Sequence, residues 1–210
     1  MINKNKIELL KKGNQLPLME SFYTLQGEGF YKGSAAFFIR IGGCDIGCHW
    51  CDVKDSWDSK IHPLTDINKI VKKAKKHSEV AIITGGEPLM WPMGPLTKKL
   101  QDSGISTHLE TSGAYPLSGF WNWICLSPKK NKLPKREWYK SADELKIIVY
   151  NKSDFIFAKI QSKKVRKKCK LFLQPEWSVR KKVNPLLVDF ILKNPEWKIS
   201  LQIHKYLNIP

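Results

Sequence analysis

Residues 41–52 read Ile41-Gly-Gly-Cys-Asp-Ile-Gly-Cys-His-Trp-Cys-Asp52, and Cys44, Cys48 and Cys51 within them are spaced C-x3-C-x2-C. Three thiolates that a short glycine-containing loop brings together make a metal site. Structural zinc sites and fully ligated iron–sulfur clusters normally take four protein ligands, so three thiolates leave one metal position open for a molecule that reacts. The spacing therefore predicts a catalytic metal site.

A zinc site is the alternative, completed by His49 or by a distant residue. The sequence contains no second C-x2-C pair and no H-x3-H pair to complete it. An iron–sulfur cluster with one open iron suits thiolate ligands and leaves room for a small chelating molecule. The loop therefore favours an iron–sulfur cluster over zinc.

The length of the chain and the positions of its cysteines limit the classes of protein to which it can belong. With 210 residues and a mass of 24.3 kDa it can bury one sizeable core, and we predict a single domain over residues 1–210. No apolar run is long enough to span a bilayer, and the lysine-rich residues 1–12 lack the apolar core of a signal peptide. Five cysteines, three of them in one loop, do not resemble a secreted disulfide framework. We expect a cytoplasmic protein with no membrane contact, in which Cys125 and Cys169 are small buried side chains.

The formal net charge of +17 comes mostly from lysine. A basic excess can indicate binding to nucleic acid, to a membrane surface or to an anionic substrate. The lysine pairs are spread over the whole chain and are not concentrated in one stripe with aromatic platforms. We therefore interpret them as a solvated surface and expect no direct contact with nucleic acid.

Short apolar runs, with helical patterns between some of them, predict an α/β protein with a largely parallel sheet. Strands are expected at residues 35–41, 80–84, 106–110, 121–126, 145–150, 170–174 and 197–203. Helices are expected at residues 66–77, behind Thr65 as the N-cap, and at residues 95–102, 153–163 and 185–193. The connections 111–120 and 127–143 have weak helical periodicity, so we expect these two crossovers to be degenerate.

Polar and glycine-rich sequence follows six of the predicted strands. In parallel α/β folds the reactive groups gather at the carboxyl edge of the sheet, where strands end and loops begin. The segments concerned are Cys44, Gly85-Gly86-Glu87-Pro88, Glu110-Thr-Ser-Gly113, Ser127-Pro128-Lys129, Gln174-Pro175-Glu176 and His204. Their common position predicts one site at this edge.

The Gly85-Gly86 pair follows a β-branched run and is either a tight turn or a place where the backbone approaches a ligand closely. Glu87, followed by the rigid Pro88, adds a fixed acceptor. Together with the three-cysteine loop, these residues resemble the radical S-adenosylmethionine (SAM) superfamily. Its cluster loop is C-x3-C-x-aromatic-C, with Trp50 as the aromatic residue here, and its second strand ends in Gly-Gly-Glu-Pro.

This resemblance implies a fold and a set of cofactors. The fold would be a compact partial (β/α) barrel, and the three cysteines would hold a 4Fe-4S cluster whose open iron is chelated by the amino and carboxylate groups of SAM. The reduced cluster would cleave the sulfonium to give a 5′-deoxyadenosyl radical. Residues 85–87 would bind the methionine amine, and residues 50–52 would lie near the adenine.

Within the superfamily the chain resembles the family of 7-carboxy-7-deazaguanine synthases. The residues that carry this likeness are Gln26-Gly-Glu-Gly29, Gly33, Phe38-Ile-Arg-Ile-Gly-Gly-Cys44, the Glu-Thr-x-Gly, Ser-Pro-Lys and Gln-Pro sites, and the closing Leu201-Gln-Ile-His-Lys205. The likeness covers residues 18–210. It also implies a homodimer and a flavodoxin-like or other reductant.

The family's reaction is a ring contraction. A hydrogen is taken from C6 of 6-carboxy-5,6,7,8-tetrahydropterin, the ring rearranges, ammonia leaves, and 7-carboxy-7-deazaguanine forms while SAM is regenerated. The product feeds queuosine and related 7-deazapurines, which links the enzyme to a tRNA modification pathway without contact to tRNA.

The resemblance also assigns residues to the two ligands. SAM would contact Trp50, Cys51, Asp52, Gly85, Gly86, Glu87, Glu110, Ser112, Ser127, Pro128, Lys129, Gln174, Pro175, Glu176 and Trp177. The pterin would contact Leu25, Gln26, Gly27, Glu28, Arg40, Thr84, His204 and the terminal carboxylate of Pro210. A pterin has a donor–acceptor edge and a carboxylate, so acceptors such as Gln26 and Glu28 and a cation such as Arg40 fit it.

Position 53 departs from the family pattern. Family members commonly have Asp-Thr after the third cysteine, with the threonine near a Mg2+ ion, whereas this chain has Asp52-Val53. Because valine has no oxygen, either the ion is held by substrate, water and other groups or the dependence on it is weaker.

Two other functions stay open on the sequence. A glycyl-radical-enzyme activase shares the cysteine loop and the short length, but residues 26–29, Arg40 and residues 201–205 argue against it. A metal-stabilised nucleic-acid-binding module is favoured by the charge and disfavoured by the parallel α/β pattern.

Overall fold

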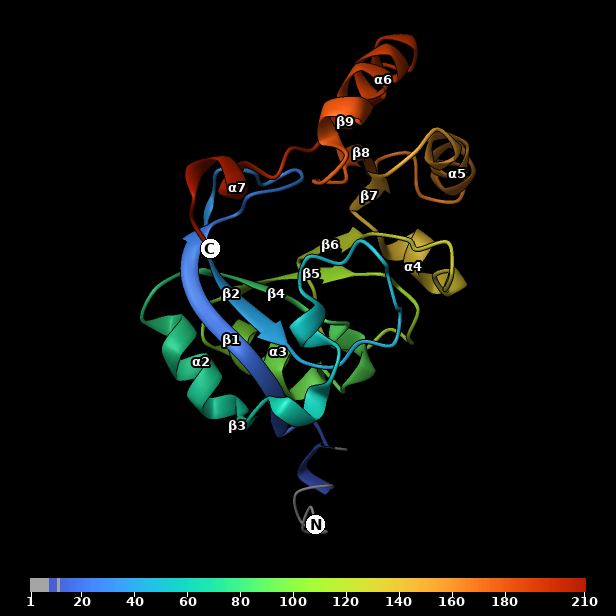
Figure 1. The fold of residues 1–210 in the computed structure, drawn as a ribbon. Helices are drawn as coiled ribbons and strands as arrows, with labels where there is room; N and C mark the ends of the chain where they lie inside the picture. The colour runs from blue at the N-terminus through green and yellow to red at the C-terminus, as the bar shows by residue number, and fades with distance from the viewer. Residues whose placement is uncertain (1–7, 11) are drawn as a thin grey trace.

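One curved sheet forms the frame of the molecule, which the computed structural model describes for residues 8–10 and 12–210 (Figure 1). Within these residues the sheet has nine strands in the order β3-β1-β2-β4-β5-β6-β7-β8-β9. The strands are β1 Gln15–Leu25, β2 Ala35–Ile41, β3 Leu64–Asp66, β4 Val80–Gly85, β5 Ser106–Thr111, β6 Trp123–Leu126, β7 Glu144–Val149, β8 Lys170–Pro175 and β9 Trp197–Ile199. Neighbours from β2 to β9 are parallel, and β1 is antiparallel to both β2 and β3.

Helices cover the outside of this sheet (Figure 1). They are α2 Ile67–Lys75, α3 Gly94–Asp102, α4 Arg136–Ser141, α5 Ser153–Ser162 and α6 Arg180–Lys193. The short helix α7 Ile203–Leu207 follows β9 and buries none of its residues. In the described part of the chain the edge strands β3 and β9 do not pair with each other, so the barrel stays open. The predicted α/β fold with a partial barrel is confirmed.

The two faces of the strands differ in character. On β7, Leu145, Ile147 and Val149 belong to the main core under the helices. Side chains alternate across a strand, so Glu144 and Lys146 lie on the opposite, inner face. Both are nevertheless buried. The interior of the barrel therefore carries charged groups that need partners.

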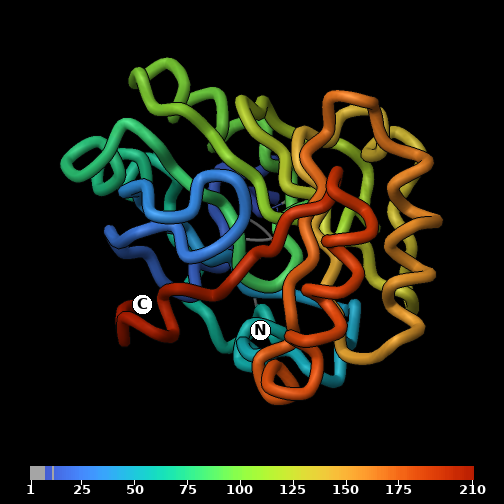
Figure 2. Tube along the Cα trace, turned by 90° about the horizontal axis from the view of Figure 1, so that it is seen from above, coloured from blue at the N-terminus to red at the C-terminus, as the bar shows by residue number. Residues whose placement is uncertain are grey.

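The connection between β1 and β2 crosses the barrel interior and supplies some of these partners. Gly29 N donates to Ser200 Oγ at 2.9 Å, and Phe30 N donates to Glu144 Oε2 at 3.1 Å. Ile203 N donates to Gly27 O at 3.0 Å. Figure 2 shows the C-terminal segment running toward the N-terminal strands. The connection and the C-terminal segment together bridge the open side of the barrel.

Five of the seven predicted strands are confirmed to within one residue, namely β2, β4, β5, β7 and β8. Strand β6 begins at Trp123, two residues later than predicted. The connection 111–120 contains no helix and the connection 127–143 contains only α4, as expected for degenerate crossovers.

The last predicted strand, 197–203, is wrong in its second half. Strand β9 ends at Ile199, and Ile203 begins helix α7. The alternation Ser200-Leu-Gln-Ile-His204 is typical of a strand. Tertiary contacts override it, because Ser200 and Gln202 turn their side chains toward Gln174 and Glu28 inside the barrel.

Several other element boundaries also differ from the prediction. Strand β1 was not predicted, since Pro17 and Glu20 interrupt its alternation, and β3 is only three residues long. The N-cap of α2 is Asp66 and not Thr65, because the Asp66 carboxylate accepts from Asn68 N at 2.7 Å. Helix α6 begins at Arg180, and Pro185 lies inside it.

No described helix has the length and apolar character needed to cross a membrane. Within the lysine-rich N-terminal stretch, residues 1–7 and 11 lie outside the described residues, so the prediction about that stretch stays a prediction.

His108, on the inner face of β5, is expected to make the fold sensitive to acid. Its ring is buried and packs on Tyr31 with ring centres 4.7 Å apart. Burial lowers the pKa of His108 from 6.5 to about 4. The unfolded chain therefore binds a proton between these values that the folded chain does not, so stability falls as the pH drops through this range, by about 3 kcal/mol. Urea unfolding at pH 7 and pH 4.5 should show this loss.

The matched variants are His108→Phe and His77→Gln, since His77 is exposed. His108→Phe should flatten the pH dependence, and His77→Gln should leave it unchanged. If the free energy of unfolding depended on pH equally in His108→Phe and in the unmodified chain, His108 would not be the source of the acid sensitivity.

Candidate active site

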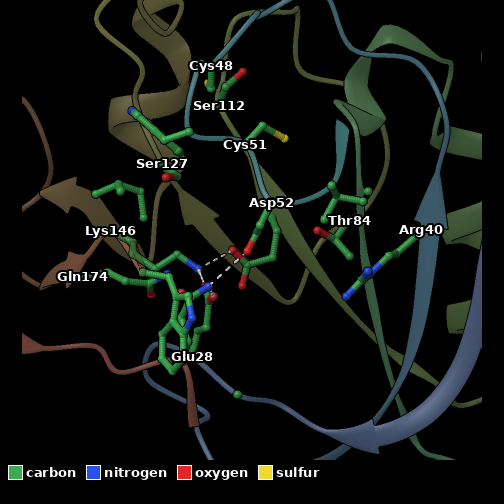
Figure 3. Close-up of a pocket in the computed structure, with 18 of the residues that line it drawn as sticks. Glu28, Arg40, Cys48, Cys51, Asp52, Thr84, Ser112, Ser127, Lys146 and Gln174 are labelled. Atoms are coloured by element: carbon green, nitrogen blue, oxygen red, sulfur yellow. Dashed lines mark hydrogen bonds and ion pairs between the residues drawn. The ribbon is translucent and has the colours of Figure 1, made fainter. Parts of the chain in front are cut away.

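A cavity of about 280 Å3 opens at the carboxyl ends of the parallel strands. The three cysteines line it, and so do the ends of β2 and β4 and the inner faces of β5, β7 and β8 (Figure 3). All of the predicted site residues line this cavity except Pro128. Ser127 and Lys129 line it, whereas Pro128 between them does not. The expectation that one edge of the sheet gathers these residues is confirmed.

The cysteine loop forms one wall of the cavity. Cys51 N donates to Cys48 O at 3.0 Å, which closes a turn, and all three thiols are free and half-buried. Burial raises the pKa of Cys44 to about 11 and also raises the pKa of Cys48. A bound metal favours the thiolate and opposes this effect of burial.

Hydrogen bonds from two neighbouring loops hold the cysteine loop in place. Asp45 accepts from Tyr115 OH at 2.6 Å and from Lys132 Nζ at 2.7 Å. Asn131 Nδ2 donates to the carbonyl of Ile46. The loops after β5 and β6 thus tie the cysteine loop to the sheet.

The double glycine at the end of β4 is packed against the chain itself. Gly86 N donates to Ile41 O and Glu87 N donates to Gly43 O, both at 2.8 Å. A Cβ atom on Gly86 would lie 2.4 Å from Gly43 O, and one on Gly85, whose φ is +121°, would lie 2.4 Å from the Ile41 backbone. These glycines are therefore required for contact between two chain segments as well as for any ligand.

The carboxylate of Glu87, which the sequence predicted as a fixed acceptor, accepts from donors of the protein itself. It is 1% exposed and accepts from Thr111 Oγ1 at 2.7 Å, Ser112 N at 2.8 Å, Ser112 Oγ and Leu89 N. The physical reason is that a buried carboxylate needs donors, and the end of β5 supplies them. The Glu87 side chain joins β4 to β5, so binding of a ligand amine by residues 85–87 stays a prediction that concerns their backbone.

A network of charges lies on the opposite wall (Figure 3). Lys146 Nζ is 2.6 Å from Glu28 Oε2 and 2.9 Å from Glu110 Oε2. Gln202 Nε2 donates to the other oxygen of Glu28 at 2.8 Å, and Gln26 Nε2 donates to Glu110 at 3.3 Å. Burial favours the neutral acid, but Lys146 and Gln202 lower the pKa of Glu28 to about 2.

Arg40 and Thr84 form a third part of the lining and are paired in register between β2 and β4 (Figure 3). Arg40 Nη1 lies 2.9 Å from Glu20 Oε1, and its guanidinium packs over the Phe22 ring at 5.2 Å. This cation is one-quarter exposed, so a second anion can reach it from the cavity.

The wall beyond the cysteines mixes aromatic and cationic groups. Lys129 Nζ donates to Ser127 Oγ at 2.6 Å and lies 5.3 Å from the centre of the Trp50 ring. Burial lowers the pKa of Lys129. The Arg180 guanidinium packs over Trp177 at 3.8 Å.

Two of the predicted acceptors in β8 and the segment after it have protein partners. Gln174 Oε1 accepts from Ser200 Oγ at 2.8 Å, and the Glu176 carboxylate accepts from Ser178 N at 3.1 Å. The Glu176 carboxylate therefore caps the approach to α6, and a role for it in holding SAM stays a prediction.

The C-terminal helix closes one side of the mouth. Lys205 Nζ lies 2.8 Å from Asp52 Oδ2, which joins α7 to the residue after the third cysteine. His204 belongs to this helix and not to a strand, and it lies so close to Gly27 that a Cβ there would be 2.0 Å from its Nδ1. Burial lowers the pKa of His204.

Comparison with known proteins identifies the family. Residues 38–121 match the Radical SAM superfamily. The chain is 56% identical over 210 residues to the 7-carboxy-7-deazaguanine synthase of Flavobacterium psychrophilum, with 100% of each chain covered. The chain belongs to the 7-carboxy-7-deazaguanine synthase family. It is also 45% identical to the Synechocystis member, covering 92% of this chain and 93% of that one.

A solved member of the family has the same fold. The crystal structure of QueE from Escherichia coli matches with a TM-score of 0.79 and 26% identity, and the match covers 96% of this chain and 99% of that one. The chain is therefore an enzyme of the radical SAM superfamily, a group that uses a 4Fe-4S cluster and SAM.

The cysteine loop fits such a cluster. Its three thiols line one cavity that extends well beyond them, so a chelating molecule has room on the open side. In the described residues no three His, Cys, Asp or Glu side chains converge closely enough to hold a single metal ion.

Sequence reasoning missed Lys146, Gln202 and Lys205 as lining residues. A signal for Lys146 was present, because Glu144 and Lys146 alternate with apolar residues in a strand that is otherwise apolar. Gln202 and Lys205 were quoted only as part of a family motif, and the predicted strand 197–203 concealed their helix.

Proposed function

We propose that this chain converts 6-carboxy-5,6,7,8-tetrahydropterin to 7-carboxy-7-deazaguanine, with loss of ammonia, for queuosine or related 7-deazapurine synthesis. The observation that carries the proposal is that one cavity joins the three-cysteine loop to the acid–lysine network and to Arg40. The first part suits SAM chemistry, and the second suits a ring with a hydrogen-bonding edge and a carboxylate. The relatives' shared name supports the same reaction.

Cys44, Cys48 and Cys51 would hold the cluster, and bound SAM would supply a 5′-deoxyadenosyl radical for hydrogen abstraction. The backbone at residues 85–87 would accept from the methionine amine. Trp50, with Lys129 beside it, would form an aromatic wall, and Ser112, Ser127, residues 174–177 and Asp52 would complete the SAM pocket.

The pterin would lie across the inner face of the barrel. Its carboxylate would pair with Arg40, with His204 nearby, and Thr84 would lie between the pterin and SAM. Its 2-amino and ring N–H donors would face Glu28 and the backbone of residues 25–27. The family resemblance assigns Glu110 to SAM; we propose it for the pterin instead, because Lys146 joins it to Glu28. Pro210 also lines the cavity, and we propose it as a further contact of the pterin.

The decisive experiment is anaerobic loading of the protein with iron and sulfide, reduction, and incubation with SAM and the pterin. Mass spectrometry should show the carboxydeazaguanine, with SAM not consumed in proportion to product. An intact, reduced cluster that cleaves SAM but gives no product would overturn the proposal. The same sample tests the glycyl-radical activase and the nucleic-acid-binding module, which the family assignment already disfavours.

Mg2+ is kept in the proposal with the ion held by substrate and water oxygens, since Val53 lines the cavity without an oxygen in its side chain. Metal ions are first removed with a chelator that leaves the cluster intact. Activity should then return only with millimolar Mg2+, and the Mg2+ concentration that restores half of the activity should be about tenfold higher than for Val53→Thr. Full activity of the unmodified chain in the absence of Mg2+ would contradict this assignment.

A homodimer, a single domain, a cytoplasmic location and a flavodoxin-like reductant stay predictions. Gel filtration with light scattering tests the first, and reduction of the loaded protein by a flavodoxin tests the last.

A further inference from the structure

Lys146 is the buried cation of the cavity wall, and the assignments above give it no role. It belongs to β7, its side chain is 5% exposed, and its ammonium contacts two carboxylates. Glu28 comes from the β1–β2 connection and Glu110 from the end of β5. A buried ammonium is costly unless such partners surround it, so the three groups form one unit.

Four further titratable groups surround this unit. The titratable groups that face it are Glu144 and Cys125 from the neighbouring strand positions, His204 from α7 and Lys129 from the loop after β6. Burial opposes a charged lysine, but the nearby carboxylates raise the pKa of Lys146 well above its usual value. The ammonium thus stays charged throughout the physiological range.

The two carboxylates can accept further hydrogen bonds from a ligand in the cavity, and their charge indicates what kind of ligand this is. All three side chains line the cavity, but Glu28 and Glu110 are 18% and 21% exposed, whereas Lys146 is only 5% exposed. Two carboxylates beside one ammonium carry a net charge of −1, which suits a ring edge with several N–H donors and repels an anionic edge.

We propose that Lys146 is a positioning residue that keeps Glu28 and Glu110 side by side and ionised, so that both accept from the guanidine-like edge of the pterin. This inference rests on the proposed function for the identity of the ligand. Without the ammonium, two carboxylates share a buried site and one of them takes up a proton. A protonated acid offers a donor where the ligand also offers a donor, so binding weakens.

The test uses the loaded enzyme with Lys146→Met, which keeps the unbranched side chain except for its terminal ammonium and so removes the charge. The KM for the pterin should rise about 10- to 100-fold, with a smaller change in kcat, since charged hydrogen bonds to the substrate are weakened before and during the reaction. The iron content and the SAM dissociation constant should not change. The kcat/KM of this variant should fall more steeply below pH 7 than that of the unmodified enzyme.

Three comparisons make the result specific. Lys146→Arg should recover most of the pterin affinity and the original pH profile, because it retains the cation. Lys198→Met, on the exposed surface of β9, controls for loss of a lysine and should match the unmodified enzyme. If Lys146→Met does not fold, the double variant Glu110→Gln/Lys146→Met is compared with Glu110→Gln, and its KM should be at least about tenfold higher, because Glu28 also loses its cation.

An unchanged KM and pH profile in Lys146→Met, or equal KM values in the Glu110→Gln background, would overturn the role of Lys146. Failure of the proposed function gives a different result, in which the unmodified enzyme cleaves SAM but makes no deazaguanine. Calorimetric titration of the pterin measures binding without turnover, so it tests Lys146 in either case.

Discussion

Replacing Cys48 with serine is expected to abolish product formation and to leave less than about one iron per chain, against about four in the unmodified protein. The loop offers three thiols to the cavity, and two cannot hold the cluster because the open position is already needed by the chelating molecule. A serine hydroxyl does not ionise at neutral pH, so it does not replace the thiolate. Iron analysis, visible absorption and SAM cleavage under reducing conditions measure the effect.

The chain offers its own control in Cys169→Ala. Cys169 is buried, and it does not line the cavity. This substitution should cost about 1 kcal/mol of stability and leave the iron content unchanged. Near-stoichiometric clusters in Cys48→Ser, or loss of iron in Cys169→Ala as well, would contradict the assignment of the loop.

The cluster loop was predictable because its chemistry lies in a contiguous spacing of residues. Cys44, Cys48 and Cys51 carry the signal without reference to the rest of the fold. The same holds for the parallel strands, whose apolar runs are bounded by glycine, proline and polar residues. The edge of the sheet then follows from the rule that reactive groups lie at carboxyl ends of parallel strands.

The acid–lysine network was not predictable in this way. Lys146 and Glu28 are 118 residues apart, and their contact depends on a loop that crosses the barrel interior. Sequence alone assigned Glu28 to the pterin and Glu110 to SAM. Their link through one ammonium becomes visible only when β5, β7 and the β1–β2 connection are placed next to one another in the structure.

In the Gly-Gly-Glu-Pro segment, the sequence identified residues that do line the cavity. It did not show that these residues also make contacts within the protein. Sequence suggested glycines for a ligand and a carboxylate as an acceptor. In the structure the glycines touch the cysteine loop and the end of β2, and the Glu87 carboxylate is occupied by Thr111 and Ser112. The segment therefore couples the frame of the barrel to the cluster loop.

Gly86→Ala tests this coupling and is expected to have a large effect. The added Cβ would lie 2.4 Å from Gly43 O and 3.0 Å from Ser56 O, and both are backbone atoms that cannot turn aside. Either β4 or the cysteine loop must move, which weakens the hydrogen bonds from Gly86 N to Ile41 O and from Glu87 N to Gly43 O. We expect the free energy of unfolding to fall by about 1–3 kcal/mol.

Iron content is the more discriminating measurement, because Gly43 is the residue before the first cysteine and its displacement misplaces the Cys44 thiol. Gly86→Ala should bind less than half of the iron of the unmodified chain, even at temperatures where it is fully folded. Gly94→Ala is the matched control, since Gly94 is the first residue of α3 and has open space around its Cβ position. That substitution should be neutral or stabilising by up to about 1 kcal/mol. Full iron loading in Gly86→Ala would show that the two segments are not coupled, and the glycine pair would then be explained by ligand contact alone.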